Sequence, residues 1–233
     1  IGETVTTRPY SISSAPFEAR GENPFAEITV RKKGNTFIPD YMFDHIKAGG
    51  ILTGSMPHGQ FYYEPLRDTK NVVALAGGSG ITPFYSMARE IKSGKLDFSL
   101  TILYGSAKAD DIILRNELDA LDCPKVKIVH VISDDAWDGE KGFLGAGLIK
   151  KYSKSDTTYF ICGPQAMYGF TEKELEKLNV PRKRIRREVF GAPRDIAKYP
   201  GFPHAAVGKT FEITVRRGIH EDAICAKAEE PVA

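Results

Sequence analysis

A glycine-rich turn at residues 76–83, AGGSGITP, has the clearest chemical use of any segment in the sequence. It leaves the apolar run NVVALAGG and enters a stretch with helical spacing, so it joins a predicted strand to a predicted helix. Glycine lets the backbone approach a phosphate, and a helix N-terminus offers free N–H groups and a positive dipole end. The residues of this candidate phosphate-binding turn are Gly78, Gly80, Thr82 and Pro83. The alternative is a tight turn without a ligand.

The turn departs from the dinucleotide fingerprint of simple dehydrogenases. Pro83 stands where the third glycine is expected, and the next predicted strand ends in Tyr104, Gly105 and Ser106 rather than in an acidic residue. That acid normally binds the ribose hydroxyl. The sequence therefore disfavours a simple Rossmann dehydrogenase, while nucleotide binding stays open.

Two further short motifs combine useful side chains. Arg8, Tyr10 and Ser11 place a cation, an aromatic ring and a hydroxyl within four residues, although an exposed edge strand would use the same residue types. Cys162, Gly163 and Pro164 follow an apolar run, where the cysteine could equally be a small buried hydrophobe. Taken alone, neither motif decides between a site and ordinary structure.

The elements that would position these residues change in kind along the chain. Residues 1–66 contain short β-type segments broken by Gly and Pro, which predict antiparallel β-structure with one short helix beginning at Pro39. From Asn71 onward, apolar strands alternate with helical stretches, which predicts βαβ units and a parallel sheet. Four predicted strand ends then meet at one edge, where a ligand binds in such sheets. They are Gly77-Gly78, Tyr104-Gly105, Ser133-Asp134 and Cys162-Gly163.

The predicted fold class is an antiparallel β-barrel joined to an α/β parallel-sheet nucleotide-binding domain. We assign the barrel to residues 1–66 and the nucleotide domain to residues 70–191. Residues 192–208 are rich in Pro and Gly and are predicted to be a linker. Residues 209–233 contain a predicted hairpin that would begin another domain.

Composition excludes several classes of protein. Apolar residues make up 42% and charged residues 27% of the 233 residues, values typical of a globular chain. A net charge of +2 is too balanced to favour nucleic acid or an anionic membrane. Three unevenly spaced cysteines offer neither a disulfide framework nor zinc-site spacing, and no apolar run could span a bilayer. We therefore expect no metal site within this chain and a cytoplasmic location.

Four motifs in order, RPYSISS, GSMPHGQF, GGSGITP and FICGPQAM, give the chain a family resemblance. From Arg8 to Gly191 it resembles the ferredoxin–NADP reductase family of flavoproteins, in its oxygenase-reductase branch. The resemblance implies a six-stranded flavin barrel and an α/β domain for the nicotinamide nucleotide. It also implies FAD, or FMN in its place, as the flavin.

The resemblance assigns a role to each matching residue. Arg8 would bind the flavin phosphate, Tyr10 would lie against the isoalloxazine ring, and Ser11 would hydrogen-bond near flavin N5. Thr82 would lie near the flavin and Cys162 beside the nicotinamide, so Ser11, Thr82 and Cys162 are the predicted catalytic residues. The remaining residues implied to bind a cofactor are Asp40 and Tyr41 through their backbone, Gly78, Gly80, Pro83, Tyr104, Ser133, Asp134, Gly163, Pro164 and Phe190.

Two departures from the family pattern matter, and the C-terminal tail carries a further resemblance. Pro39 stands where many relatives have a Ser or Thr that contacts the flavin phosphate. Relatives carry several barrel strands before the RPYS motif, so we expect this chain to hold part of the barrel and to bind flavin weakly by itself. The tail resembles the first hairpin of a plant-type [2Fe–2S] ferredoxin, whose cluster cysteines would lie beyond this chain.

The charge near the predicted adenine ribose favours NADH. Ser133, Asp134 and Asp135 would accept a ribose hydroxyl and repel a 2′-phosphate. The sequence thus predicts an NADH-dependent flavoprotein reductase that passes electrons to an iron–sulfur centre or to a partner enzyme such as an oxygenase. Two alternatives stay open: a flavin reductase that releases reduced flavin, and a non-catalytic nucleotide-binding subunit.

Overall fold

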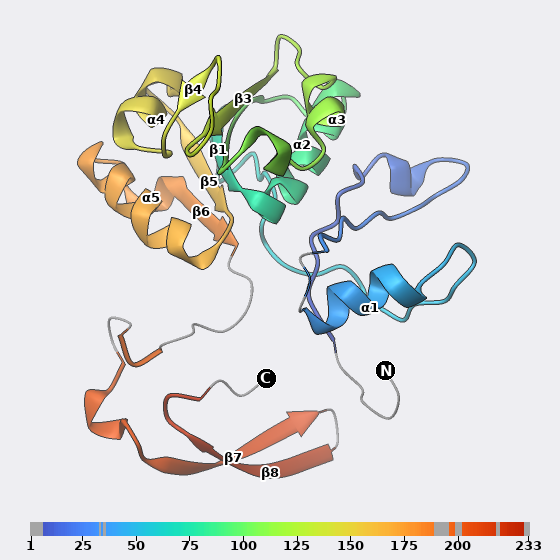
Figure 1. Cartoon of the computed structure of the whole chain (residues 1–233), viewed down its shortest axis with the longest axis vertical. Helices are drawn as coiled ribbons and strands as arrows, with labels where there is room; N and C mark the ends of the chain where they lie inside the picture. The colour runs from blue at the N-terminus through green and yellow to red at the C-terminus, as the bar shows by residue number, and fades with distance from the viewer. Residues whose placement is uncertain are drawn as a thin grey trace. The chain divides into compact units, whose positions relative to one another are not determined.

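The computed structural model describes residues 7–32, 34, 36–188, 196–198, 202–217 and 220–230 (Figure 1). The chain divides into two compact units, Ile1–Val189 and Phe190–Ala233. Phe190, which the sequence places against the flavin, lies outside the described residues.

A parallel sheet forms the centre of the first unit. Among the described residues, six strands pair in the order β4-β3-β2-β1-β5-β6, and each pair of neighbours is parallel. The strands are β1 (Asn71–Gly77), β2 (Ser99–Ser106), β3 (Val126–Ile132), β4 (Glu140–Lys141), β5 (Thr158–Cys162) and β6 (Ile185–Glu188). Each crossover returns to the same end of the sheet, which makes the strands parallel. Chain order and spatial order differ because β5 pairs with the side of β1 that β2 leaves open. The parallel sheet predicted from the alternating strands and helices is confirmed.

Helices cover both faces of this sheet (Figure 1). Neighbouring residues of a strand point to opposite faces, so Ala74 packs with one helix layer while Val73 and Leu75 pack with the other. The first layer contains α2 (Thr82–Lys92) and α3 (Arg115–Asp119), and the second contains α4 (Ala146–Tyr152) and α5 (Gln165–Lys177). Burial on both faces explains why the strands are apolar along most of their length.

The N-terminal region, residues 7–66, differs from the prediction of antiparallel strands. Its described residues contain the 3-10 turn η1 (Glu18–Arg20), helix α1 (Phe37–His45) and a single antiparallel bridge between Ile12 and Ile28. A β-type segment becomes a strand only when a neighbour accepts and donates its backbone hydrogen bonds. Apart from that bridge, the described part of this region pairs no such neighbours.

The predicted short helix is confirmed, but it starts earlier than expected. Helix α1 begins at Phe37, so Pro39 is its third residue and not its first. The first four N–H groups of a helix have no partner within it, so a proline is tolerated at this position as well. The helix ends at His45, ahead of Gly49 and Gly50.

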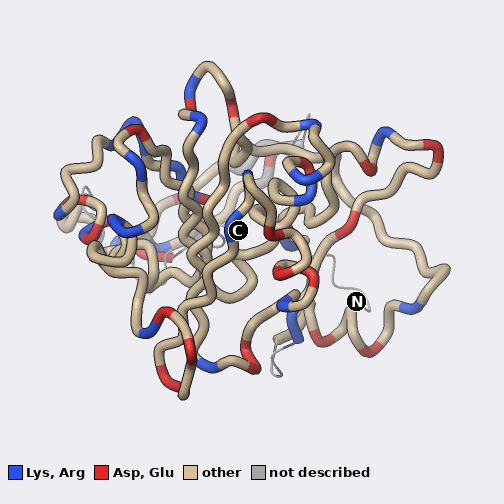
Figure 2. The backbone as a smooth tube through the Cα atoms, turned by 90° about the horizontal axis from the view of Figure 1, so that it is seen from above, with Lys and Arg blue, Asp and Glu red and all other residues tan. Residues whose placement is uncertain are grey.

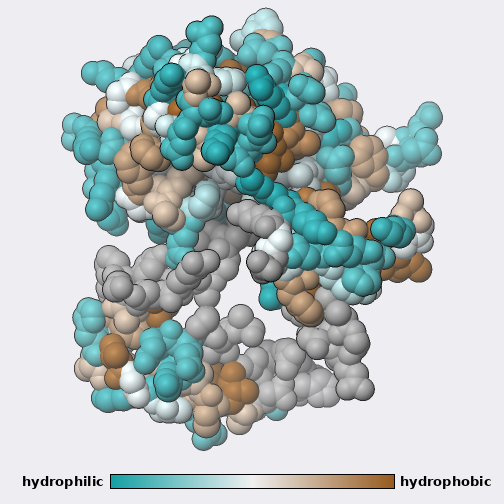
Figure 3. Space-filling model, in the orientation of Figure 1, coloured by the Kyte–Doolittle hydropathy of each residue, from teal (hydrophilic) through white to brown (hydrophobic). Residues whose placement is uncertain are grey.

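Large apolar side chains of the N-terminal region face solvent (Figure 3). Ile51 is 92% exposed, Met56 84% and Leu66 99%. The polar groups of the region, by contrast, are attached to α2: Ser86 Oγ donates to the carbonyl of Ser14 at 2.7 Å, and Glu90 accepts from the N–H of Phe17 at 2.9 Å. Residues 14–17 are therefore attached to the α/β domain through polar contacts, whereas Phe61 and Tyr63, further along the region, pack their rings on its core.

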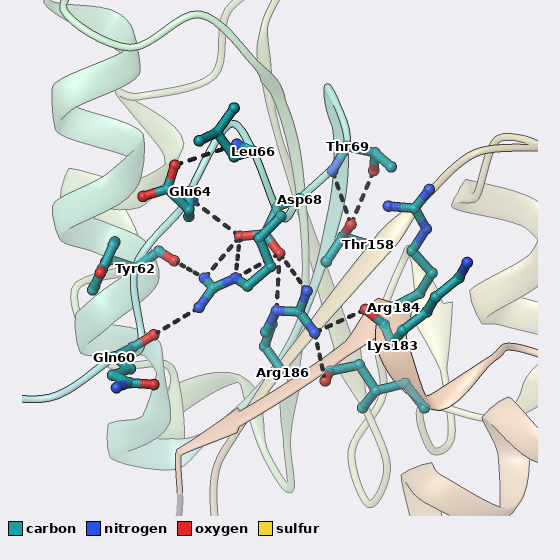
Figure 4. Close-up of polar contacts among 12 residues, drawn as sticks. Gln60, Tyr62, Glu64, Leu66, Asp68, Thr69, Thr158, Lys183, Arg184 and Arg186 are labelled. Atoms are coloured by element: carbon teal, nitrogen blue, oxygen red, sulfur yellow. Dashed lines mark hydrogen bonds and ion pairs between the residues drawn. The ribbon is translucent and has the colours of Figure 1, made fainter.

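A buried carboxylate lies where the N-terminal region meets β1 (Figure 4). The side chain of Asp68 is fully buried and forms ion pairs at 2.8 Å with both Arg67 and Arg186. Arg67 also donates to the carbonyl of Tyr62, and Asp68 accepts the N–H of Glu64 at 3.0 Å. The network thus ties the chain entering the sheet to its edge strand β6.

The second unit contains the predicted hairpin. Strands β7 (Thr210–Arg217) and β8 (His220–Lys227) pair antiparallel, with Ile213 opposite Ile224 and Glu212 opposite the exposed Cys225. Two 3-10 turns, η5 (Ile196–Lys198) and η6 (His204–Ala206), lie within the predicted linker. Whether this unit begins a ferredoxin domain stays a prediction.

The distribution of charged residues and the length of the helices agree with what the composition predicts. Lys and Arg are interspersed with Asp and Glu over the backbone (Figure 2). Within the described ranges, every helix is too short or too polar to cross a lipid bilayer.

Candidate functional site

The glycine-rich turn packs directly against the end of β5. After β1 the chain forms the 3-10 turn η2 (Gly78–Ile81) and then enters α2 at Thr82. Gly78 has φ +52°, and a Cβ added to Gly80 would lie 2.1 Å from the carbonyl oxygen of Cys162. Gly80 must therefore be glycine for the turn to approach Cys162 and Gly163 this closely. Two motifs that lie far apart in the sequence meet here.

Side chains within the turn satisfy its own backbone. Thr82 Oγ1 donates to the carbonyl of Ser79 at 3.0 Å, and Pro83 follows where no N–H donor is needed. Thr82 and Pro83 are both buried at the start of α2. The positive end of the α2 dipole faces the turn, as the phosphate-binding prediction requires.

Tyr104 supports the turn from within the core. Its hydroxyl donates to the carbonyl of Gly78 at 3.0 Å and accepts the N–H of Ile113 at 3.2 Å. The residue is fully buried, and burial raises the pKa of its hydroxyl. In this structure Tyr104 fixes the position of Gly78, which is a different task from the ligand contact expected from the sequence.

Cys162 lies at the carboxyl end of β5 as a neutral thiol. Burial, followed by the nearby Glu188 carboxylate, raises the pKa of Cys162 to about 12, although a hydrogen bond with Tyr168 acts in the opposite direction. The Tyr168 hydroxyl accepts the N–H of Gly163 at 3.2 Å and donates to the carbonyl of Glu188. Cys162 is therefore a weak hydrogen-bond partner here, without the thiolate that nucleophilic chemistry needs.

Ser11 reaches the same place from the N-terminal region. Its hydroxyl donates to Glu188 Oε2 at 3.2 Å. Burial raises the pKa of Glu188, while the Ser11 hydrogen bond lowers it by a smaller amount. Ser11, Glu188, Tyr168 and Cys162 thus form a connected group beside the glycine-rich turn.

The sequence analysis did not identify Glu188 or Arg31. Glu188 belongs to the segment REVFG, in which only Phe190 matched a family motif. A carboxylate two residues before this predicted site residue could have pointed to Glu188. Arg31 follows the apolar run AEITV, where it resembled an ordinary solvated charge. Its Nη1 lies 3.8 Å from the position of a Cβ added to Gly78, so it is close to the turn.

The residues predicted to hold the flavin lie in the N-terminal region. Arg8 is exposed, and its Nη1 donates to the carbonyl of Thr7 at 2.6 Å. Burial raises the pKa of the partly buried Tyr10, against a smaller lowering by Arg8. Both residues precede Ser11 in the chain, and their contact with a flavin stays a prediction.

The start of α1 is less open than the prediction assumed. The N–H of Asp40 donates to the carbonyl of Thr36 at 3.1 Å, and the Asp40 carboxylate accepts the N–H of Thr36 at 2.7 Å. The ring of Tyr41 stacks on His45, with 4.4 Å between ring centroids. The backbone N–H of Asp40 is thus engaged within the helix, because α1 begins three residues before it.

The loop after β3 holds the predicted ribose-binding residues. The N–H of Ser133 donates to the carbonyl of Ser106 at 3.1 Å, and that of Asp134 to the carbonyl of Ala107 at 2.9 Å. The carboxylates of Asp134 and Asp135 are exposed at this edge of the sheet. Backbone hydrogen bonds therefore hold the loops after β2 and β3 together and leave these carboxylates facing solvent.

In the described part of the chain, no group of three or more His, Cys, Asp or Glu side chains is arranged to hold a metal ion. The polar groups that converge are instead a serine, a protonatable carboxyl, a neutral thiol and backbone N–H groups. Such a set can orient a ligand and limit access of water. It supplies no thiolate nucleophile.

Comparison with known proteins agrees with this geometry. Residues 74–173 match the family model of the oxidoreductase NAD-binding domain. NADH-cytochrome b5 reductase 2 of Scheffersomyces stipitis is 29% identical over 170 residues, which cover 69% of this chain and 55% of that protein. A flavohemoprotein of Oceanobacillus iheyensis is 24% identical over 204 residues, covering 83% and 49%. The chain spans about half the length of these curated relatives.

A solved structure gives the same result for the fold. The flavohem-like FAD/NAD-binding domain of nitric oxide dioxygenase from Vibrio cholerae superposes with a TM-score of 0.64 at 22% identity. The match covers 78% of this chain and 76% of that chain. The likeness is one of fold, and it confirms the predicted fold class.

Proposed function

We propose that this chain is the reductase part of an NADH-dependent flavoprotein. The observation that carries the proposal is the convergence of Ser11, Cys162 and the glycine-rich turn at the carboxyl ends of β1 and β5. This edge is where parallel α/β sheets bind nucleotides. The matched NAD-binding model and the reductases among the relatives support the same activity.

The residues present fit a nicotinamide dinucleotide. The turn from Gly78 to Thr82 combines a positive φ with the N-terminus of a long helix, and both favour a bound pyrophosphate. Asp134 and Asp135, exposed on the loop after β3, would accept a ribose hydroxyl and repel a 2′-phosphate. NADH is therefore the proposed reductant.

We propose that the flavin binds beside the Ser11 and Glu188 pair. When bound, NADH supplies a hydride, and a flavin accepts two electrons and releases them singly. Ser11, oriented by Glu188, would hold the reacting edge of the flavin. The high pKa of Cys162 keeps the thiol uncharged, so it would add no negative charge beside the nicotinamide. Arg8 and Tyr10 are the proposed contacts for the flavin phosphate and ring, with FAD or FMN as the flavin.

Electrons would leave this chain for an iron–sulfur centre or for a partner protein. The β7 and β8 hairpin, which resembles the first hairpin of a plant-type ferredoxin, supports the iron–sulfur acceptor. The names of two relatives, an NADH-cytochrome b5 reductase and a flavohemoprotein, favour a cytochrome or a haem group as the acceptor instead. The proposed reductase activity is therefore separate from the choice of electron acceptor, for which we propose an iron–sulfur centre.

An anaerobic titration tests the activity directly. The purified chain is mixed with excess FAD or FMN, and the visible flavin absorbance is followed after NADH is added. We expect NADH to bleach the flavin much faster with the chain than without it, and NADPH to act more slowly. Ser11→Ala should slow this bleaching, whereas Ser93→Ala, at the far end of α2, should not. Equal rates with and without the chain would contradict the proposed function.

A further inference from the structure

An ion pair joins Arg31, which lies beside the glycine-rich turn, to the segment that follows β2. Arg31 Nη2 lies 3.0 Å from Oδ1 of Asp111, which ends the 3-10 turn η3 (Ala109–Asp111). The other guanidinium nitrogen, Nη1, lies 3.8 Å from the Cβ position of Gly78. One guanidinium therefore faces both the Asp111 carboxylate and the turn proposed to bind a pyrophosphate.

Tyr104 fixes the distance between these two sides. Its hydroxyl bonds the carbonyl of Gly78 at 3.0 Å and the N–H of Ile113 at 3.2 Å, and Ile113 is two residues beyond Asp111. The turn and the Asp111 segment are thus anchored to the same buried group. Arg31 comes from the N-terminal region and reaches the set through a long, partly exposed side chain.

The two possible partners of Arg31, the Asp111 carboxylate and a bound pyrophosphate, differ in how strongly they attract its guanidinium. The side chains of Arg31 and Asp111 are 32% and 40% exposed, and ion pairs this open to water are weak. A pyrophosphate seated on the turn carries more charge and offers oxygens in the fork geometry that a guanidinium matches. It should therefore draw Arg31 away from Asp111.

We propose that Asp111 competes with the dinucleotide pyrophosphate for Arg31 and so sets the affinity for NADH. This inference rests on the proposed function, because NADH is the ligand. Without a ligand, the ion pair attaches the N-terminal region to the α/β domain. When the pyrophosphate binds, Arg31 turns to it and the Asp111 carboxylate is released to water.

The test measures NADH binding to the full chain through the emission of Trp137, its single tryptophan, which bound NADH should quench by energy transfer. Asp111→Asn frees Arg31 and should tighten NADH binding by about three- to fivefold, the upper part of the range of an exposed ion pair. Asp110→Asn is the matched control, since it removes the same charge from the exposed neighbouring residue. We expect it to change affinity by less than about twofold.

A double-mutant cycle assigns the effect to Arg31. In an Arg31→Met background, which should itself bind NADH more weakly, Asp111→Asn should have no further effect. Asp111→Asn should also tighten binding of ADP, which carries a pyrophosphate, and leave adenosine unchanged. Circular dichroism and thermal unfolding check that each variant is folded.

The two ways of failing are distinct. A folded parent chain that shows no NADH binding would overturn the proposed function and this inference with it. A parent chain that binds NADH, with Asp111→Asn and Asp110→Asn giving the same affinity, would leave the proposed function intact and overturn the competition. Tighter adenosine binding in Asp111→Asn would also overturn it, because adenosine has no phosphate for Arg31.

Discussion

The α/β domain and the N-terminal region are held in place by different forces. In the domain, Phe84, Phe98 and Phe160 are almost completely buried among neighbouring strands and helices. Burying a side chain of this size stabilises a fold by about 1.5–3 kcal/mol. In the N-terminal region, Ile51 and Leu66 are nearly fully exposed, and hydrogen bonds and ion pairs to α2 attach its first part. Only near its end does an aromatic ring, that of Phe61, pack on Phe84 and Phe160.

The difference shows how the two regions divide the work at the site. A rigid sheet places Cys162 and the glycine-rich turn, because residues of β1 and β5 are locked by parallel pairing. The N-terminal region brings Ser11 and Arg31 to that edge through a few polar contacts. The second region should therefore open locally without unfolding the first.

The largest effect is expected from Asp68→Asn at the junction. It leaves Arg67 and Arg186 without their buried partner, which should lower the free energy of unfolding by about 3–5 kcal/mol in a urea titration. Asp97→Asn is the matched control, because Asp97 pairs with Lys70 and Lys125 on the exposed surface and should change stability far less. Equal losses of stability in the two variants would mean that the buried Asp68 network does not contribute to the cooperative unfolding of the chain.

The stability that is lost in Asp68→Asn should depend on pH. Burial alone would raise the pKa of Asp68, but hydrogen bonds from Arg67 and the Glu64 backbone and the charge of Arg186 outweigh it, so the pKa is lowered. A lowered carboxyl pKa gives stability that is present above the unfolded value, about 3.9, and is lost as the pH falls through the folded value. Asp68→Asn should remove this part of the acid dependence.

A smaller and local effect is expected from Arg89→Ala. Arg89 pairs with Glu18 and Glu27, and its guanidinium also donates to the carbonyl of Ser13. Its loss should weaken the attachment by about 1–3 kcal/mol, seen as faster hydrogen exchange at the N–H of Ser13 while the β1 amides keep their protection. Arg115→Ala, an exposed arginine over Trp137, is the control. Loss of protection throughout the sheet would show that the two regions are one unit.

Nucleotide choice should depend on the α/β domain alone. Replacing Asp134 with Ser and Asp135 with Arg should narrow the preference for NADH over NADPH by about tenfold, or about 1.4 kcal/mol. Flavin affinity, measured separately by absorbance, should stay unchanged. Asp138→Asn on the same loop is the control. A parent chain that already prefers NADPH would contradict the role given to this loop.

The smallest effect concerns Glu188, which joins the two regions through Ser11. Its pKa is raised by burial, so the stability it contributes is complete below the unfolded value, about 4.3, and is lost as the pH rises through the folded value. Glu188→Gln should therefore be at least as stable as the parent at neutral pH, with the difference vanishing in acid. Glu176→Gln, at an exposed position of α5, is the control. Parallel pH profiles for the parent and Glu188→Gln would contradict the burial argument.

The amino-acid sequence by itself determined the α/β domain. Apolar runs of strand length, separated by helical spacing and glycine turns, predict a parallel sheet whose central strands are buried on both faces. Apart from the two-residue strand β4, the strands from Asn71 to Glu188 and the glycine-rich turn are found where the sequence places them. The β7 and β8 hairpin follows from the same kind of local signal.

Only the tertiary structure decided the contacts between distant segments. The Ser11 bond to Glu188 joins residues 177 positions apart, and the approach of Gly80 to Cys162 depends on the packing of η2 against β5. The pairing of Arg31 with Asp111, the burial of Asp68 and the missing strand ladders of the N-terminal region are likewise settled by which neighbours the fold supplies. A hydrogen bond or an ion pair needs both partners in place, and local sequence describes one partner at a time.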